Sequence, residues 1–324
     1  MCKIIGIDIS KKTFDVCFEG QDEFEHKIYA NDLKGFRSFK KELDNNSIVV
    51  MEASGPYYVR LACYLHQHHI RVSVVNPLII KRFAQMKFYR AKTDKKDAGI
   101  ILEYGLIDQE NLALWKPDSN GVQALKQMHT TLELLQKQLN QSKNQLSAFN
   151  SSGFVNKEVK KGLTKTIVSL EKAIVDLENQ MLIVCKTHYA QSFKLLTSIP
   201  CIGAKTAMML IAITDDFTKF DHYKQLIAYV GFSPRIYESG TSVRGKGHIC
   251  KMGKSQIRKL LYLCTWTAKR YNKTCKEMYD RLQAKGKPER VIKIAIANKL
   301  LKQAFAVVTK KQKYVENYQP NICF

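Results

Sequence analysis

Four carboxylates in the first hundred residues have types and spacings that could hold a metal ion. Asp8 lies in an apolar run, residues 3–9, and Glu52 closes another. Asp94 and Asp97 are three residues apart, so they share one face if their segment begins a helix. A charge on an apolar strand is costly unless it is paired or bound to a metal. Oxygen ligands of this kind suit Mg²⁺ or Mn²⁺, and two such ions can clamp the attacking and leaving oxygens of a phosphodiester.

Each carboxylate taken alone also has an ordinary structural explanation. Asp8 could cap a turn, and Glu52 could stand in the first turn of a helix. Asp94 and Asp97 could complement the positive end of a helix dipole. The combination favours the metal site, because an Asp on the first strand and a carboxylate on a later one is the ribonuclease-H-like arrangement.

The hydrophobic pattern predicts that an α/β domain positions these side chains. Three strands come first, and helices and strands then alternate. The expected strands cover residues 3–9, 13–19, 27–29, 47–51 and 71–75, and the expected helices cover residues 32–43, 78–86 and a stretch from residue 56.

Apolar residues then follow a heptad spacing over residues 125–139 and 163–184, on either side of a polar turn at 150–153. This spacing predicts two long helices that form an antiparallel coiled-coil hairpin. Heptads do not say which helix fills the groove. Two alternatives therefore remain open. The hairpin could form a homo-oligomer, either a dimer or a tetramer, or its two helices could pair only with each other.

The charge of the chain is large and unevenly distributed. The net charge is +23, and residues 201–324 carry 24 basic and 8 acidic side chains, whereas residues 1–110 carry 17 and 15. Such an excess predicts a polyanionic partner, either nucleic acid or an acidic membrane surface. No stretch reaches the length of a membrane span. We therefore expect a cytoplasmic protein with no membrane partner.

The nine cysteines contain no C-x-x-C pair, which indicates reduced thiols and argues against a zinc site.

The C-terminal region, residues 193–324, is predicted to be mainly helical, with helices over 255–271 and 288–309. Between residues 231 and 254 lies a loop in which glycines alternate with cations. Glycines let backbone approach phosphate and cations neutralise it. The alternative is an ordinary solvated loop. The expected nucleic-acid contacts are Arg235, Arg244, Lys246, Lys251 and Lys254, with Lys92 and Lys95 beside the carboxylate pair.

Six short segments resemble the insertion sequence family 110 transposases, over about residues 3–270. Three lie in the N-terminal half and three in the C-terminal half. They are Gly6–Lys11, Met51–Gly55, Lys92–Ala98, Ser198–Gly203, Leu226–Arg235 and Glu238–Gly240. The resemblance implies a RuvC-like ribonuclease-H domain whose Asp8, Glu52, Asp94 and Asp97 bind metal.

The resemblance also implies a helical transposase domain with a nucleophilic serine, matched here by Ser239. The same region contains other serines, such as Ser233, Ser242 and Ser255. Most loop serines of this kind only cap a helix or contact solvent. Members of the family act with a structured guide RNA encoded by their own element. Cys201 stands where the family usually has Gly, so that position is expected not to need a positive φ.

The leading hypothesis is a transposase or site-specific recombinase of a bacterial insertion sequence, acting on donor and target DNA and directed by a guide RNA. Its expected domains are a catalytic RuvC-like domain, residues 1–115, a coiled-coil linker, residues 116–192, and a helical basic domain with the serine, residues 193–324. One alternative is a RuvC-like nuclease that cuts branched DNA by hydrolysis alone. The other is a nucleic-acid-binding protein without catalysis.

Overall fold

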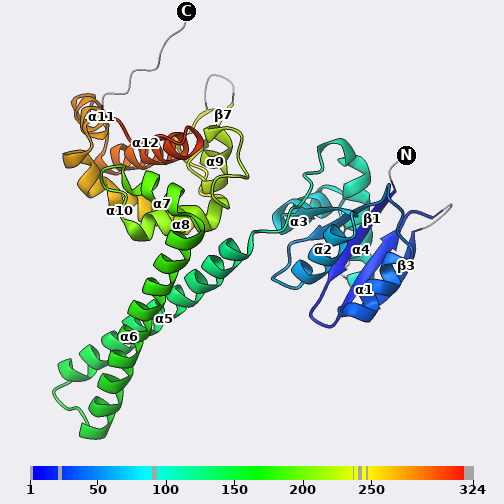
Figure 1. Ribbon diagram of the computed structural model, residues 1–324, viewed down its shortest axis with the longest axis horizontal. Coiled ribbons are helices and arrows are strands. Elements are labelled where there is room, and N and C mark those ends of the chain that lie inside the picture. Colours follow the sequence, from blue (N-terminus) through cyan, green and yellow to red (C-terminus); the bar gives the residue numbers. More distant parts are fainter. Residues whose placement is uncertain are drawn as a thin grey trace, which may run out of the picture. The chain divides into compact units, whose positions relative to one another are not determined.

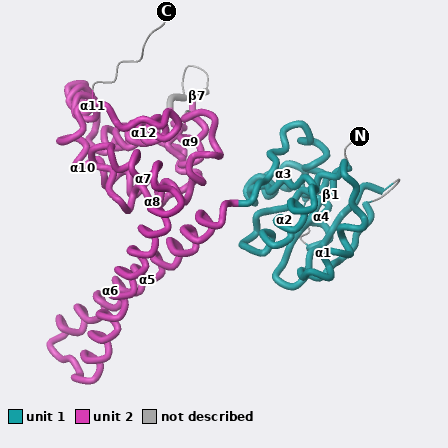
Figure 2. The backbone as a smooth tube through the Cα atoms, in the orientation of Figure 1, with its two compact units in different colours: residues 1–117 teal, residues 118–324 magenta. Residues whose placement is uncertain are grey.

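The chain folds into two compact units. The computed structural model describes residues 3–20, 24–89, 93–235, 237–239, 243–245 and 247–316. One unit comprises residues 1–117 and the other residues 118–324 (Figure 2). The first unit mixes strands and helices, and the second is mostly helical (Figure 1). Across these ranges no helix is both long and apolar enough to cross a membrane.

A five-stranded mixed sheet lies at the centre of the first unit. In spatial order its strands are β3 (Glu25–Ala30), β2 (Thr13–Phe18), β1 (Ile4–Ile9), β4 (Ile48–Glu52) and β5 (Arg71–Val75). The first three are antiparallel neighbours, and β4 and β5 run parallel to β1. The five predicted strands are confirmed. The third is longer than expected, because its half-exposed residues carry a weaker apolar signal.

Helices cover both faces of this sheet. One face packs against α1 (Leu33–Lys40) and α2 (Tyr58–Gln67), and the other against α3 (Pro77–Met86) and α4 (Asp94–Ile107). A 3₁₀ turn, η1 (Gln109–Asn111), follows α4. Asp32 caps α1 by accepting hydrogen bonds from two backbone amides, and the Thr93 hydroxyl caps α4 by accepting one from the amide of Lys96. These caps fix where the two helices begin.

Helix α4 lies in direct backbone contact with β1. A Cβ atom built on Gly6 would come within 2.3 Å of the Leu102 amide nitrogen and 2.4 Å of the Ala98 carbonyl oxygen. One on Gly105 would come within 2.8 Å of the Ile4 side chain. Only glycine permits such an approach. The first turn of α4 is thereby brought to the end of β1.

Eight helices and two short ladders make up the described part of the second unit. The helices are α5 (Asn120–Ser151), α6 (Lys157–His188), α7 (Ala190–Thr197), α8 (Ala204–Thr214), α9 (Tyr223–Val230), α10 (Ser255–Tyr271), α11 (Lys273–Ala284) and α12 (Glu289–Thr309). Helix α8 is buried from Thr206 to Thr214 and forms the centre of the unit. The expected helices over 255–271 and 288–309 are confirmed as α10 and α12, whereas α9 and α11 were not predicted.

The two longest helices, α5 and α6, pack against each other as an antiparallel pair (Figure 1). Near the core of the unit, their heptad residues Leu125, Leu132 and Met181 are buried. Towards the turn at residues 152–156, heptad residues such as Leu139 and Leu163 are only half-buried. Within the described chain, the heptad side chains are therefore fully buried near the core of the unit and only partly buried near the turn.

Cys201 contradicts one expectation, because it adopts a left-handed φ of +81°. Its side chain packs against the core of the second unit, and its thiol is hydrogen-bonded to Thr267. A non-glycine residue in this conformation costs on the order of 1 kcal/mol. The expectation that cysteine excludes a positive φ was wrong because it left out the stabilising contacts of the side chain.

We predict that Gly6→Ala lowers the free energy of unfolding by about 1–3 kcal/mol, because the added methyl group overlaps the backbone of α4. Gly99→Ala is the matched control. Gly99 lies on α4, the helix that the added methyl group of Gly6→Ala would overlap. A Cβ atom added at Gly99 would have its nearest neighbour 3.8 Å away. Alanine also favours a helix over glycine by up to about 1 kcal/mol. Denaturant unfolding of both variants measures the difference. Equal stability of the two variants would show that the close approach is not a constraint.

Candidate active site and nucleic-acid surface

Three acidic side chains lie on the face of the sheet that packs against α4. Alternate residues of a strand face the same side, so Asp8 faces α4 as Gly6 does. Gly6 pairs with Val50 on β4. Two residues further along both strands, the same register places Asp8 beside Glu52. On the other side Asp8 pairs with Asp15 on β2. The strand register thus brings three carboxylates together.

The first turn of α4 adds two more carboxylates to this group. Burial raises the pKa of Asp8 to about 6, and the charges of Asp97, Asp94, Glu52 and Asp15 contribute to the rise in that order. A carboxylic acid whose pKa is raised by other carboxylates must lie within the range of their charges. The four residues singled out from the sequence therefore belong to one electrostatic cluster.

The cluster is an open group of carboxylates. The Ser54 hydroxyl donates a 2.6 Å hydrogen bond to Glu52 Oε1. Among the described residues, no three His, Cys, Asp or Glu side chains converge closely enough to hold a metal ion as they stand. The chemistry of the donor set still fits a hard divalent cation. All donors are oxygens, and a bound cation would relieve the repulsion that raises the pKa of Asp8.

Asp15 was missed by the sequence reasoning. It is buried, at 8% exposure, and its Oδ1 lies 2.8 Å from Nε2 of His26 on the neighbouring strand β3. The signal was present, because residues 13–19 alternate and place Asp15 and Cys17 on the face opposite Phe14. An acidic residue on the inner face of an apolar strand is the same feature that pointed to Asp8.

The first turn of α4 also carries cations. Lys95 and Lys96 are exposed and line a surface hollow together with Phe24 and Tyr89. Lys92, the other cation expected here, lies outside the described residues. Cations next to acidic ligands give this edge of the unit groups that can contact the phosphates of a bound strand.

The predicted glycine-rich loop is a two-stage hairpin. Pro234–Arg235 (β6) pairs with His248–Ile249 (β9), and further out Glu238–Ser239 (β7) pairs with Val243–Arg244 (β8). Between the two ladders the Gly245 amide donates to the Tyr237 carbonyl. Ser239 is the last described residue before residues 240–242, the segment that links β7 to β8. Lys246 lies outside the described residues.

The base of this hairpin is held tightly against the end of α9. Gly231 and Gly253 have positive φ, and a Cβ on either would come within 2.4 Å of a backbone oxygen. The guanidinium group of Arg258 donates a 2.5 Å hydrogen bond to the Val230 carbonyl. Lys251 and Lys254 lie at this base and are exposed. The hairpin thus projects from a fixed base that carries two of the predicted phosphate contacts.

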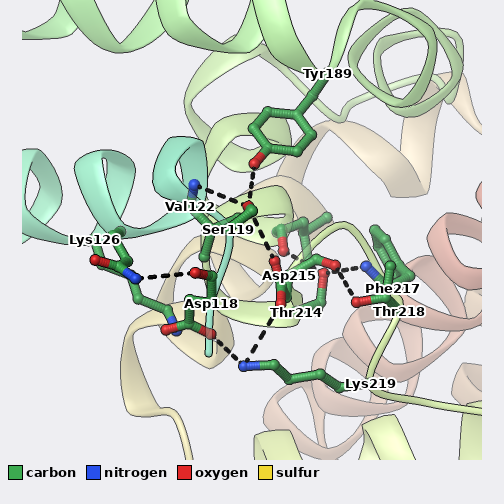
Figure 3. Close-up of polar contacts among 12 residues, drawn as sticks. Asp118, Ser119, Val122, Lys126, Tyr189, Thr214, Asp215, Phe217, Thr218 and Lys219 are labelled. Carbon is green, nitrogen blue, oxygen red and sulfur yellow. Dashed lines mark hydrogen bonds and ion pairs between the residues drawn. The ribbon is translucent and has the colours of Figure 1, made fainter. Parts of the chain in front are cut away.

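Asp118 joins α5 to the loop after α8, as Figure 3 shows. Its carboxylate binds Lys126 at 2.5 Å and also Lys219. The next residue, Ser119, is hydrogen-bonded to Tyr189 at 2.6 Å and to Asp215. This network holds the turn over residues 215–217, where three consecutive residues have positive φ.

Lys254 lies close enough to this network to respond to it. Desolvation lowers the pKa of Lys254, and the charges of Lys126 and Lys219 lower it further, against an opposing effect of Asp118. Its Nζ is 5.6 Å from the centre of the Tyr229 ring. The network therefore brings three lysines together with two carboxylates, Asp118 and Asp215. Lys126 and Lys219 could not be assigned to this surface from the sequence, since both are distant from the hairpin along the chain.

Two transposase family models match successive parts of this chain. Residues 5–151 match a transposase family model of the DEDD IS110 type, and residues 193–280 match the model described as transposase IS116/IS110/IS902 family. The pilin gene-inverting protein of Moraxella bovis is 31% identical over 320 residues, covering 96% of this chain and 97% of the relative. The chain belongs to the IS110 family of transposases. The transposase for insertion sequence element IS1111A of Coxiella burnetii is 25% identical over 343 residues, covering 96% of this chain and 91% of that protein.

Membership of the family makes this chain a DNA transposase or recombinase of an insertion sequence. Enzymes of the DEDD type depend in general on divalent metal. The prediction of the family and of the enzyme class is confirmed. The roles of individual residues and the identity of the metal remain predictions. The seven cysteines in the described residues are free thiols.

We predict that Asp8→Asn stabilises the metal-free protein. The pKa of Asp8 rises from 3.8 to about 6 on folding, so its ionised form opposes folding and the penalty is complete above pH 6. At pH 7.5 in chelator the variant should be about 1 kcal/mol more stable, since partial exposure screens the repulsion. The difference should shrink as the pH falls towards 4. Mg²⁺ or Mn²⁺ should raise the melting temperature of the original protein more than that of the variant. Equal shifts in both proteins would contradict the metal site.

We also predict that Lys251→Gln and Lys254→Gln each weaken duplex DNA binding and reduce its salt dependence. Each lost phosphate contact should lower the slope of log K against log salt by roughly 0.9. Lys161→Gln is the matched control, because Lys161 is exposed near the turn between α5 and α6. Fluorescence anisotropy over a salt series measures the slopes. An unchanged slope in both test variants would place the DNA surface elsewhere.

Proposed function

We propose that this transposase cuts and rejoins DNA with two separate sets of residues. Asp8, Glu52, Asp94 and Asp97 hold Mg²⁺ or Mn²⁺, and Ser239 is the nucleophile. The observation that carries the proposal is the placement of Asp8 and Glu52 on adjacent strands of one sheet, with Asp94 and Asp97 in the first turn of the helix packed against the same face. In this scheme residues 1–115 form a RuvC-like catalytic domain, residues 116–192 a coiled-coil linker, and residues 193–324 the basic domain that carries the serine.

The carboxylates have a positioning task that follows from their elements. Asp8 and Glu52 come from adjacent strands and are held in register by backbone hydrogen bonds. Asp94 and Asp97 come from the first turn of a helix fixed against the sheet by Gly6. A divalent cation bound there would stabilise negative charge on a phosphodiester. Rigid elements make the spacing of the ligands reproducible.

Ser239 supplies a covalent step that hydrolysis lacks. Its hydroxyl oxygen forms a bond to the DNA phosphorus and loses its proton to a base, while the displaced deoxyribose oxygen takes up a proton. The resulting phosphoserine ester conserves the energy of the broken bond for rejoining. The place of Ser239 on β7, in the outer ladder of the hairpin, supports this role.

The proposal includes a structured guide RNA and a homo-oligomer. Support for a second polyanion comes from the charge of residues 201–324, which exceeds that of the rest of the chain. Support for self-association comes from apolar side chains that α5 and α6 leave exposed by 53–59%, namely Leu134, Val168, Val175 and Ile183. A second copy of the chain would cover these side chains, which lie next to the heptad positions on both helices.

DNA inversion is a second candidate function. The relatives that match at 31% identity over nearly the whole chain are named pilin gene-inverting proteins, from Moraxella bovis and Moraxella lacunata. Inversion and transposition use the same breaking and rejoining of strands. They differ in their DNA sites, because inversion requires two sites in opposite orientation on one DNA molecule. A plasmid with two inverted copies of the element's end would separate them.

We predict that Ser239→Ala abolishes the covalent adduct with nicked DNA, and that Asp8→Asn slows strand cleavage by at least roughly 100-fold. Both variants should still bind duplex with affinity close to that of the original protein. Adduct trapping in Mg²⁺ or Mn²⁺, followed by peptide mapping, identifies the linked residue. Ser233→Ala is the matched control within the same hairpin.

Three outcomes would contradict parts of the proposal. An adduct at another serine would reject Ser239 as the nucleophile. Strand exchange by Ser239→Ala, with no adduct in the original protein, would favour hydrolysis or metal-only chemistry. Cleavage by Asp8→Asn at the original rate would reject the carboxylate site.

A further inference from the structure

Helix α10 exposes an unassigned stripe of cations and large apolar groups. Residues Lys259, Leu263, Trp266 and Arg270 follow one another at spacings of four, three and four, so they share one side of the helix. Leu263 is 53% exposed and Trp266 is 52% exposed. The buried residues of α10 are on its other side, namely Ile257, Leu261, Thr265 and Ala268, and the helix packs against α8, α11 and α12. Figure 1 shows α10, α11 and α12 as neighbours. The stripe lies on a different element from the hairpin and carries no acidic residue.

The indole ring of Trp266 is held in place from one side by a buried cation. Nζ of Lys293 lies 3.4 Å from the ring centre, although the Lys293 side chain is only 5% exposed. Glu289 fixes this lysine by an ion pair at 3.2 Å, and it also binds Lys269 at 3.3 Å and the Tyr279 hydroxyl at 2.5 Å. Cation–π contacts of this kind stabilise an aromatic ring in one orientation.

This arrangement inverts the usual preference, because a lysine is buried while a tryptophan next to it is half exposed. Nζ of Lys269 also lies 5.5 Å from the ring centre, and 52% of the Trp266 side chain is still exposed, so part of the ring remains available to solvent. Base stacking on such a ring contributes about 1–3 kcal/mol per base and tolerates any sequence. The exposed cations on the same stripe, Lys259 and Arg270, suit the phosphates on either side of a stacked base.

We propose that Trp266 is a stacking platform for one base of an unpaired DNA strand, with Lys259 and Arg270 contacting its phosphates. In duplex DNA both faces of every base are already stacked, so a duplex cannot use the ring in this way. Recombination exposes unpaired bases when strands are exchanged, and the platform would hold one of them. The inference rests on the proposed function only in taking DNA as the partner, and it requires neither Ser239 nor the carboxylates.

The test uses the small number of tryptophans in the chain, Trp115 and Trp266. In Trp115→Phe the fluorescence reports on Trp266 alone. Titration with an oligothymidylate should quench this fluorescence, whereas a duplex of the same length should bind with little quenching. In Trp266→Phe the remaining Trp115 signal should not respond. The same titration with oligouridylate distinguishes DNA from RNA as the source of the base.

Binding constants give the second readout. Trp266→Ala should weaken binding of the unpaired strand by about 5- to 150-fold and leave duplex affinity within about twofold. Trp266→Tyr should retain most of the affinity, because it keeps an aromatic face. Thermal unfolding of Trp266→Tyr shows whether the fold is kept if the alanine variant is unstable. Asp8→Asn and Ser239→Ala should quench like the original protein, so that a failure of catalysis is distinguishable from a failure of stacking.

Several results would overturn the inference. Absence of quenching, or equal loss of duplex and unpaired-strand binding in Trp266→Ala and Trp266→Tyr, would reject stacking. Quenching by the RNA oligomer alone would reject DNA as the occupant. Quenching that grows with protein concentration in the absence of DNA would assign the stripe to a second copy of the chain.

Discussion

The candidate active site depends on one close approach, the contact of α4 with β1 at Gly6. The backbone of the helix rests where a side chain would otherwise stand, with Leu102 and Ala98 against the position of the missing Cβ. Asp8 is two residues along the same face of the strand, and Asp97 precedes Ala98 on the helix. The carboxylates of strand and helix therefore become neighbours as a direct result of the absence of a side chain. A larger residue at position 6 would lift the helix and separate the ligands while leaving the sheet itself intact.

The second unit solves a different positioning problem, because its candidate nucleophile lies on a hairpin of only two-residue ladders. Such short ladders contribute little stability on their own. The hairpin is instead fixed at its base, where Gly231 and Gly253 allow tight backbone contacts and Arg258 binds the end of α9. Asp118 then connects the start of α5 to the loop after α8 through Lys126 and Lys219. A rigid base and a projecting end are what a loop that must contact a large substrate needs.

The sequence predicted the elements better than it predicted their contacts. All five strands of the sheet followed from apolar runs, and α10 and α12 followed from their length and periodicity. Asp8, Glu52, Asp94 and Asp97 were singled out because carboxylates on apolar elements are unusual in themselves, and their role as ligands stays a prediction. Asp15 was missed since its significance depends on pairing with Asp8 across two strands, and Lys126 and Lys219 were missed since only folding brings them to Lys254. Cys201 shows the limit of a conformational rule, because packing around its side chain offsets the cost of the left-handed backbone.

In both candidate sites a titratable group has surroundings that disfavour its charged form. At the sheet edge, burial and like charges oppose ionisation of Asp8, and near the hairpin desolvation and two lysines oppose protonation of Lys254. A ligand of the opposite sign would relieve each unfavourable interaction, and we propose a divalent cation in the first case and a phosphate in the second. Relief of repulsion adds to the binding free energy, and by linkage the bound ligand stabilises the fold. In this proposal the residues that weaken the isolated protein also raise its affinity for metal and DNA. That gain is a reason for the fold to tolerate them at these two places.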